Sequence, residues 1–291
     1  MPIVAVGLIL IAAVLHAVYN FLIKSSRDVV AFFWWTVAIG TVGYGCWLLA
    51  GPGIFLSPGS VPYFLISTAA EFGYFLSLVR GYAHGDLSLV YPISRGSPPL
   101  FLAAWSALFL SERLPSAGYA GIAIAVSGIC LTSLTPQEAG TFRFGDLLGS
   151  FRRPAALWAV ASGIFISVYS LTDKLAVAST PPLVYNFWVY AGNAILWSVV
   201  VWKPSRAVGN ISMLKSNPLR ILLAAAATVG AYSAVLIALT MTSASYVVAG
   251  RGLSVVVGAL LGTVVLKEHF GRLRITGALL TVVGLTVMAL S

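Results

Sequence analysis

Ten long apolar runs constrain the fold of this chain more than any other feature of its sequence. A helix needs about 20 predominantly apolar residues to cross a bilayer, and clusters of Pro, Gly, Ser and charged residues separate the runs. The predicted spans are residues 3–24, 29–50, 61–83, 88–110, 115–134, 154–174, 181–202, 218–241, 245–266 and 272–290. Since only 9% of the residues are charged and the mean hydropathy is +0.96, the sequence predicts an all-α membrane protein with ten transmembrane helices.

The first of these runs is predicted to be a retained span, because it lacks the basic segment and the small-residue cleavage site of a signal peptide. Cys46 and Cys130 lie within apolar runs, without the spacing of a metal site, and are expected to be packing residues. The sequence contains no Walker loop, no GxSxG nucleophile and no HExxH motif. It therefore predicts neither an enzyme nor a site for a cofactor or a metal.

Lysine and arginine are distributed very unevenly between the two sides of the membrane. The gaps after the odd-numbered spans contain thirteen of them, and the opposite gaps contain only Arg113 and Lys174. Because basic residues favour cytoplasmic loops, both termini are predicted to lie outside the cytoplasm. The same bias accounts for the net charge of +9 without a nucleic-acid partner.

The chain is an internal duplication. A shift of 156 residues, the separation of Arg95 and Arg251, aligns further identical pairs: Gly96 with Gly252, Glu112 with Glu268, Gly121 with Gly277, and Gly128 with Gly284. The predicted organisation is a first repeat at 1–134, a cytoplasmic linker at 135–153 and a second repeat at 154–291. Each repeat contains five spans, an odd number, so the second must be inverted in the membrane. Inverted repeats are typical of transporters that expose a midplane site alternately to either side.

Glu71 is the acidic side chain placed nearest to the middle of a predicted span. A charged residue at the centre of a membrane helix costs about 2.5–3.5 kcal/mol on the translocon scale. Glu71 is therefore expected either to face a cavity, as an amine-binding group or proton carrier, or to be a neutral acid bonded to a neighbouring helix.

Polar and aromatic side chains in other spans are further candidates for substrate binding. His16 and Asn20 are one helical turn apart and lie close to Tyr19, so the three can line one helix face. In the seventh span, Tyr190 and Asn193 belong to a polar and aromatic stripe that should face the bundle interior. The remaining aromatic candidates are Tyr74, Tyr82, Tyr91, Trp158, Tyr169 and Tyr232.

The fourth span contains the segment YPISRGSPP, which combines an arginine with helix-disrupting residues. Its prolines, Pro92, Pro98 and Pro99, remove backbone donors and predict a kink or an unwound segment. Gly96 permits close approach of another backbone or of substrate. Arg95 alone could snorkel to the interface, but its repeat partner Arg251 lies toward the opposite face. The two arginines are therefore predicted to belong to the gates or the central site, together with the glycine that follows each of them, Gly96 and Gly252.

The paired segments resemble the EamA family of the drug/metabolite transporter superfamily. The resemblance rests on YAHGDLSLVYPISRGSPPLFLAAWSALFLSERLPSAGYAGIAIAVSGICL and its second copy, TSASYVVAGRGLSVVVGALLGTVVLKEHFGRLRITGALLTVVGLTV, where Glu112 and Glu268 match a family glutamate. It implies a ten-helix inverted-repeat fold with a central cavity. It also implies a location in a bacterial inner membrane, and aromatic amino-acid exporters are the nearest analogy. One departure is that many members have Trp in the first helix where this chain has the segment around His16.

The leading hypothesis is a secondary transporter that exports neutral or aromatic amino acids as a monomer or weak homodimer. In this hypothesis Arg95 and Arg251 bind the substrate carboxylate and Glu71 binds its amine or a proton. One alternative is a phosphorylated-sugar or nucleotide-sugar antiporter, which would need more basic residues to hold phosphate. The others are a non-transporting receptor or structural subunit and a membrane-embedded enzyme acting on lipid, although no acid and base pair has convincing spacing.

Overall fold

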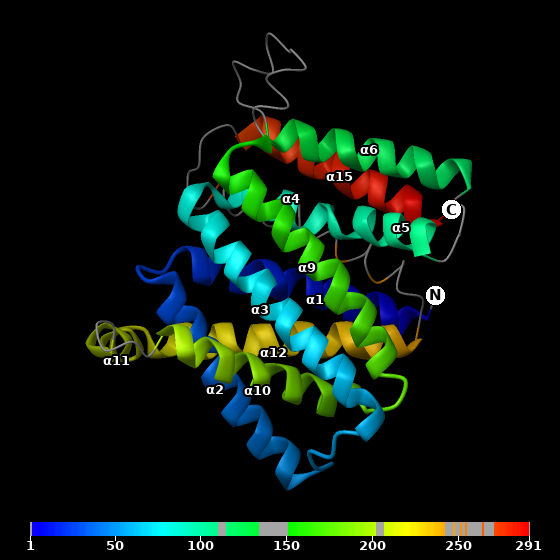
Figure 1. The fold of residues 1–291 in the computed structure, drawn as a ribbon. Helices are drawn as coiled ribbons and strands as arrows, with labels where there is room; N and C mark the ends of the chain where they lie inside the picture. The colour runs from blue at the N-terminus through cyan, green and yellow to red at the C-terminus, as the bar shows by residue number, and fades with distance from the viewer. Residues whose placement is uncertain are drawn as a thin grey trace. The chain divides into compact units, whose positions relative to one another are not determined.

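A computed structural model describes residues 2–109, 115–133, 151–201, 207–241, 247, 251, 254, 264 and 271–290 (Figure 1). All regular structure longer than one turn in this part of the chain is α-helical. The helices are α1 (Ile3–Lys24), α2 (Val29–Ala50), α3 (Val61–His84), α4 (Leu87–Gly96), α5 (Pro98–Phe109), α6 (Ser116–Ser133), α9 (Pro154–Ala176), α10 (Pro182–Val201), α11 (Ala207–Ser216), α12 (Pro218–Met241) and α15 (Gly271–Leu290).

Six of these helices are long and apolar enough to cross a membrane. They are α1, α2, α3, α9, α10 and α12, and their bounds agree with the predicted spans to within about two residues. Helices α6 and α15 have shorter apolar stretches at the positions of the fifth and tenth predicted spans. The ninth predicted span, 245–266, lies outside the described residues except for four isolated positions.

The fourth predicted span is two helices, α4 and α5, which meet at Ser97. Pro98 and Pro99 lack the N–H groups that would bond to the carbonyls of Ser94 and Arg95, so the hydrogen-bond ladder is interrupted here. The backbone N–H groups of Leu100 and Phe101 instead bond to the Ser97 carbonyl, at 3.0 and 3.2 Å. The predicted break is confirmed, although Pro92 lies inside α4 without ending it.

One helix was not expected from the apolar pattern. The gap between the seventh and eighth predicted spans contains the ten-residue helix α11, with Met213 buried and Ile211 and Lys215 exposed. Met213 is the one buried side chain among residues 211–216, and so short and polar a helix carries too weak a pattern to predict from sequence.

The described helices form two compact units. Unit 1 comprises Met1–Gly73 and Val168–Thr242, and unit 2 comprises Tyr74–Ser167 and Ser243–Ser291. Each unit therefore draws on both predicted repeats, and α3 and α9 contribute to both units. The division of the sequence at a linker, 135–153, stays a prediction.

Within unit 1, α2 packs against both α10 and α12, and α12 also packs along α1 (Figure 1). Small residues allow these contacts: a Cβ added at Gly40 would lie 3.1 Å from Val229 Cγ2, and one at Gly45 would lie 2.7 Å from Phe187. Close approach through small residues is the usual basis of helix association in membranes, where lipid is as apolar as the side chains.

Within unit 2, α6 and α15 pack along their length through glycines (Figure 1). A Cβ added at Gly277 would lie 2.7 Å from the Gly128 carbonyl oxygen, and one at Gly284 would lie 2.6 Å from that of Gly121. In these contacts the residue number rises along α15 while it falls along α6, so the two helices are antiparallel. They are also reciprocal, because Gly121 corresponds to Gly277 in the duplication and Gly128 corresponds to Gly284. Such reciprocity is the mark of a two-fold relation.

The glycine contact between α6 and α15 predicts that Gly284→Ala destabilises the protein. The added methyl group would overlap backbone atoms of α6, which cannot rotate away, and overpacking of this kind costs about 1–3 kcal/mol. The measurement is the apparent melting temperature of the purified protein in detergent. Gly43→Ala is the matched control, because Gly43 is exposed on α2 with nothing within 4 Å of its added Cβ. Equal melting temperatures for the two variants would show that the close packing is not required.

Candidate functional site

Asp173 is the centre of a hydroxyl network in unit 1. It lies on α9 with 1% of its surface exposed. Its Oδ1 accepts hydrogen bonds from the Ser67 hydroxyl at 2.6 Å and from the Tyr185 hydroxyl at 3.0 Å, and its Oδ2 accepts one from the Tyr232 hydroxyl. An ionised carboxylate can only accept hydrogen bonds, so three hydroxyl donors suit that form. The network joins α3, α9, α10 and α12.

Glu71 lies one helical turn beyond Ser67 on α3, so the two side chains share a helix face. Its carboxyl group is 5% exposed, and its Oε2 accepts a hydrogen bond from Asn193 Nδ2 at 3.1 Å. The same Asn193 nitrogen also donates to the Val189 carbonyl, at 3.0 Å. Unit 1 thus contains two buried carboxyl groups, Glu71 on α3 and Asp173 on α9, and each is bonded to a side chain of α10.

Three tyrosine rings lie beside these carboxyl groups. The Tyr232 ring centroid is 6.1 Å from that of Tyr169 and 6.2 Å from that of Tyr190. The Tyr190 hydroxyl donates to the Thr228 carbonyl at 3.0 Å. Because aromatic faces attract cations, acidic groups flanked by tyrosines form surroundings that favour a positively charged group.

Several polar atoms near Glu71 have no hydrogen-bond partner among the described residues. They are Asn193 Oδ1, Trp197 Nε1 and Thr68 Oγ1, all buried. Trp197 follows Asn193 by one turn of α10, and a Cβ added at Gly192 would lie 2.7 Å from Thr68 Cγ2. Buried polar groups in proteins nearly always have a partner. These atoms therefore offer hydrogen-bonding capacity to a polar ligand or to water.

The predicted group on α1 includes hydrogen bonds within its own helix. The His16 Nδ1–H donates to the Ala12 carbonyl at 2.9 Å, and Asn20 Nδ2 donates to the His16 carbonyl at 2.7 Å. The His16 and Tyr19 rings are 5.4 Å apart, and all three predicted residues are buried in unit 1. Their role in substrate binding stays a prediction.

In unit 2, Arg95 is held by aromatic residues. It is buried, its Nη2 donates to the Tyr74 hydroxyl, and its guanidinium lies 5.0 Å from the Tyr74 ring centroid and 5.8 Å from that of Tyr91. This environment weighs against simple snorkelling to the interface. Arg251 is also buried, and the hydroxyl of Ser254 donates to its carbonyl at 2.6 Å.

The other predicted residues of unit 2 are more scattered. Tyr82 is buried, whereas Trp158 is half-buried with the exposed Arg80 guanidinium 5.6 Å from its ring. A Cβ added at Gly96 would lie 2.6 Å from Thr281 Cγ2, so the predicted close approach at this glycine is to α15. Gly252 lies outside the described residues. The gating roles of Pro92, Gly96, Pro98, Pro99 and Gly252 stay predictions.

Asp173 was not predicted from the sequence, nor were its donors Ser67 and Tyr185. Asp173 precedes Lys174 at the end of the predicted span 154–174. One signal was available, because Asp173 follows the predicted cavity residue Tyr169 by four positions and so shares its helix face. Tyr185 is fully buried and bonded to Asp173, so its ring faces the bundle interior.

Spanning helices joined by buried acidic and hydroxyl groups define a polytopic membrane protein with a polar interior. The model of the EamA-like transporter family matches residues 3–134 and 153–290, and the chain belongs to that family. It is therefore a membrane transporter of the drug/metabolite type, in agreement with the predicted resemblance.

Comparison with other proteins supports the fold but identifies no substrate. No curated protein matches this chain. A solved structure described only as "Crystal structure of protein" is similar, with a TM-score of 0.62 and 19% sequence identity, over 100% of this chain and 98% of that chain. At this identity the likeness concerns the fold alone.

The Asp173 network predicts that Asp173→Ala destabilises unit 1 strongly. The substitution leaves three buried hydroxyl groups without their acceptor, and an unsatisfied buried polar group costs about 1–3 kcal/mol. Asp173→Asn keeps an acceptor oxygen and should lower the melting temperature less. Thr172→Ala is the control on the same helix, because the Thr172 hydroxyl bonds to carbonyls of its own helix. If Asp173→Ala melts no lower than Thr172→Ala, the network does not stabilise the unit.

Proposed function

We propose that the protein is a secondary transporter that exports small metabolites carrying an amino group, in the first place neutral or aromatic amino acids. The observation that supports this best is the pair of buried carboxyl groups, Glu71 and Asp173, beside tyrosine rings in unit 1. An ammonium group gains charge-assisted hydrogen bonds from a carboxylate, and an apolar side chain gains contact area from aromatic rings.

The two carboxyl groups are assigned different roles. Asp173 already accepts three hydroxyl hydrogen bonds, so its role is to hold α3, α9, α10 and α12 in register. Glu71 lies beside the unpartnered Asn193 Oδ1 and is the group that binds the amine or carries a proton. Arg95 and Arg251 stay the candidates that the sequence offers for the substrate carboxylate.

Alternating access around a midplane site is the proposed mechanism. The reciprocal antiparallel contact between α6 and α15 supports an inverted repeat, because a two-fold axis perpendicular to two spanning helices lies in the membrane plane. The break between α4 and α5 at Pro98 is proposed as a bending point. The proposed location is a bacterial inner membrane, with both termini outside the cytoplasm as the lysine and arginine bias predicts.

A sugar-phosphate or nucleotide-sugar substrate fits the buried cluster of unit 1 less well. Phosphate would meet two carboxyl groups there, Glu71 and Asp173, and like charges in a low-dielectric interior repel strongly. A non-transporting subunit fits less well than a transporter because the chain belongs to a transporter family.

Glu71→Gln is expected to lower substrate transport at least about tenfold, since the amide cannot form the charge-assisted bond or release a proton. The assay is counterflow of a labelled substrate in liposomes that contain the purified protein. The substrate is selected first by comparing metabolites exported by cells with and without the protein. Asp86→Asn, which makes the same chemical change at the start of α4, is the control. Transport by Glu71→Gln at the rate of the control would contradict the assigned role.

A further inference from the structure

A second polar site lies at one end of unit 1, formed by the turns between helices rather than by the interiors of the spans. It is a pocket of about 500 Å³ lined by residues of the α1–α2 turn, of α11 and of the start of α12. The lining residues used below are Ser25, Arg27, Ser212, Asn217 and Arg220. None of them belongs to the Asp173 network or to the predicted substrate residues.

Two arginines give the pocket its charge. Arg220 is half-buried; its Nη2 donates to the Ser25 hydroxyl at 2.6 Å, and its guanidinium lies 6.0 Å from the Phe32 ring centroid. These contacts hold the guanidinium in position, and most of its five N–H donors stay available to a ligand. Arg27 is exposed and forms no hydrogen bond or ion pair with any described residue.

The acidic residue nearest to these arginines along the chain is Asp28, and its carboxylate is engaged in backbone hydrogen bonds. Asp28 Oδ1 accepts the backbone N–H groups of Val30 and Ala31, both at 3.0 Å, and so caps α2. The other carboxyl groups of unit 1 in the described part of the chain, Glu71 and Asp173, are engaged in the buried cluster. The lining of the pocket includes two arginines and no acidic residue, so the pocket is a cationic hollow.

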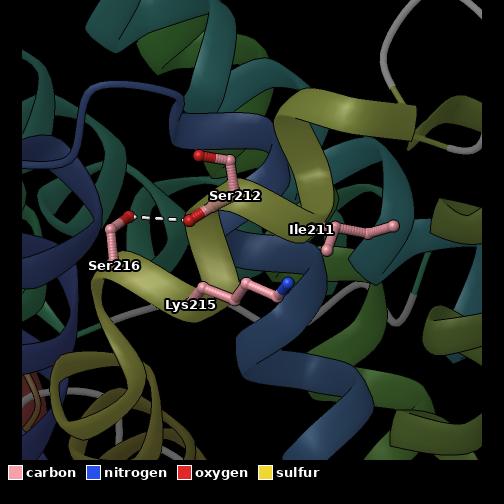
Figure 2. Close-up of a pocket in the computed structure, with 4 residues that line it drawn as sticks. All are labelled: Ile211, Ser212, Lys215 and Ser216. Atoms are coloured by element: carbon pink, nitrogen blue, oxygen red, sulfur yellow. Dashed lines mark hydrogen bonds between the residues drawn. The ribbon is translucent and has the colours of Figure 1, made fainter.

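Helix ends of both signs meet at the pocket, so its preference for an anion comes from side chains. Helix α12 begins at Pro218 and carries partial positive charge there, whereas α1 and α11 end at Lys24 and Ser216 and carry partial negative charge. An adjoining hollow on α11 is lined by Ile211, Ser212, Lys215 and Ser216 (Figure 2). It shares Ser212 and Ser216 with the pocket and adds a third cation, Lys215, and an exposed apolar side chain, Ile211.

We propose that this pocket binds a phosphate group, with Arg27 and Arg220 as the ligands. Two guanidinium forks match the geometry of phosphate oxygens, and a single lysine does not. The pocket lies at the ends of the spanning helices α1, α2 and α12, which is headgroup depth, and the exposed Ile211 beside Lys215 suits a lipid chain next to its phosphate. The phosphate can come from an anionic lipid or from a soluble phosphate, and the experiment separates the two.

The test uses the purified full-length protein in nanodiscs of phosphatidylcholine, and it measures the melting temperature from tryptophan fluorescence. One arm replaces part of the lipid with phosphatidylglycerol, and the other adds inorganic phosphate at constant ionic strength. We expect a stabilising shift in at least one arm. Arg27→Gln or Arg220→Gln should weaken the apparent affinity about tenfold, since each removes one charged hydrogen-bonding group.

Arg152→Gln is the matched control, because it removes the same charge at an exposed position of unit 2, outside the pocket. Arg27→Lys keeps the charge but loses the fork and should recover only part of the affinity. If Arg220→Gln fails to fold, Arg27→Gln decides alone, since Arg27 is exposed and has no hydrogen-bond or ion-pair partner among the described residues. The proposal is overturned if neither phosphatidylglycerol nor inorganic phosphate stabilises the wild type. It is also overturned if Arg27→Gln keeps the wild-type affinity in every arm in which the wild type is stabilised. No transport is measured, so this result is independent of the proposed export function.

Discussion

The bonding of buried acidic groups is the interaction on which this structure depends. A carboxyl group within a membrane helix has no water to bond with, so its partners must come from neighbouring helices. Asp173 meets this condition by accepting three hydroxyl groups from three other helices. These hydrogen bonds join four helices of unit 1, so the acidic residue that is costly to insert also links the helices that surround it.

Glycine packing is the complementary constraint. Apolar side chains gain nothing by leaving lipid, so helices associate where small residues let backbones approach. In unit 2 the glycines of α6 and α15 meet in reciprocal pairs that the duplication relates to each other. The same residues that record the duplication in the sequence therefore also form the contact in the structure.

Much of the fold followed from the sequence, because the bilayer prescribes both the length and the polarity of a span. The bounds of α1, α2 and α12 were predicted to the residue, and the prolines predicted the break before α5. Helix α11 was missed because its short, polar sequence carries no such signal. Among the residues of unit 1 that were predicted to bind substrate, Glu71 bonds to Asn193 and the ring of Tyr232 neighbours those of Tyr169 and Tyr190; their role stays a prediction.

The sequence by itself determined the class of protein, its spanning helices and the duplication, since these depend on local composition and on internal similarity. Only the tertiary structure decided which polar groups bond to one another. Asp173 lies far along the chain from Ser67, and the hydrogen bond between them depends on how α9 packs against α3. The same holds for Arg220 and Ser25, whose hydrogen bond lies in the proposed phosphate pocket. Neither pair has a sequence spacing that could reveal it, because spacing predicts neighbours within one helix and not between helices.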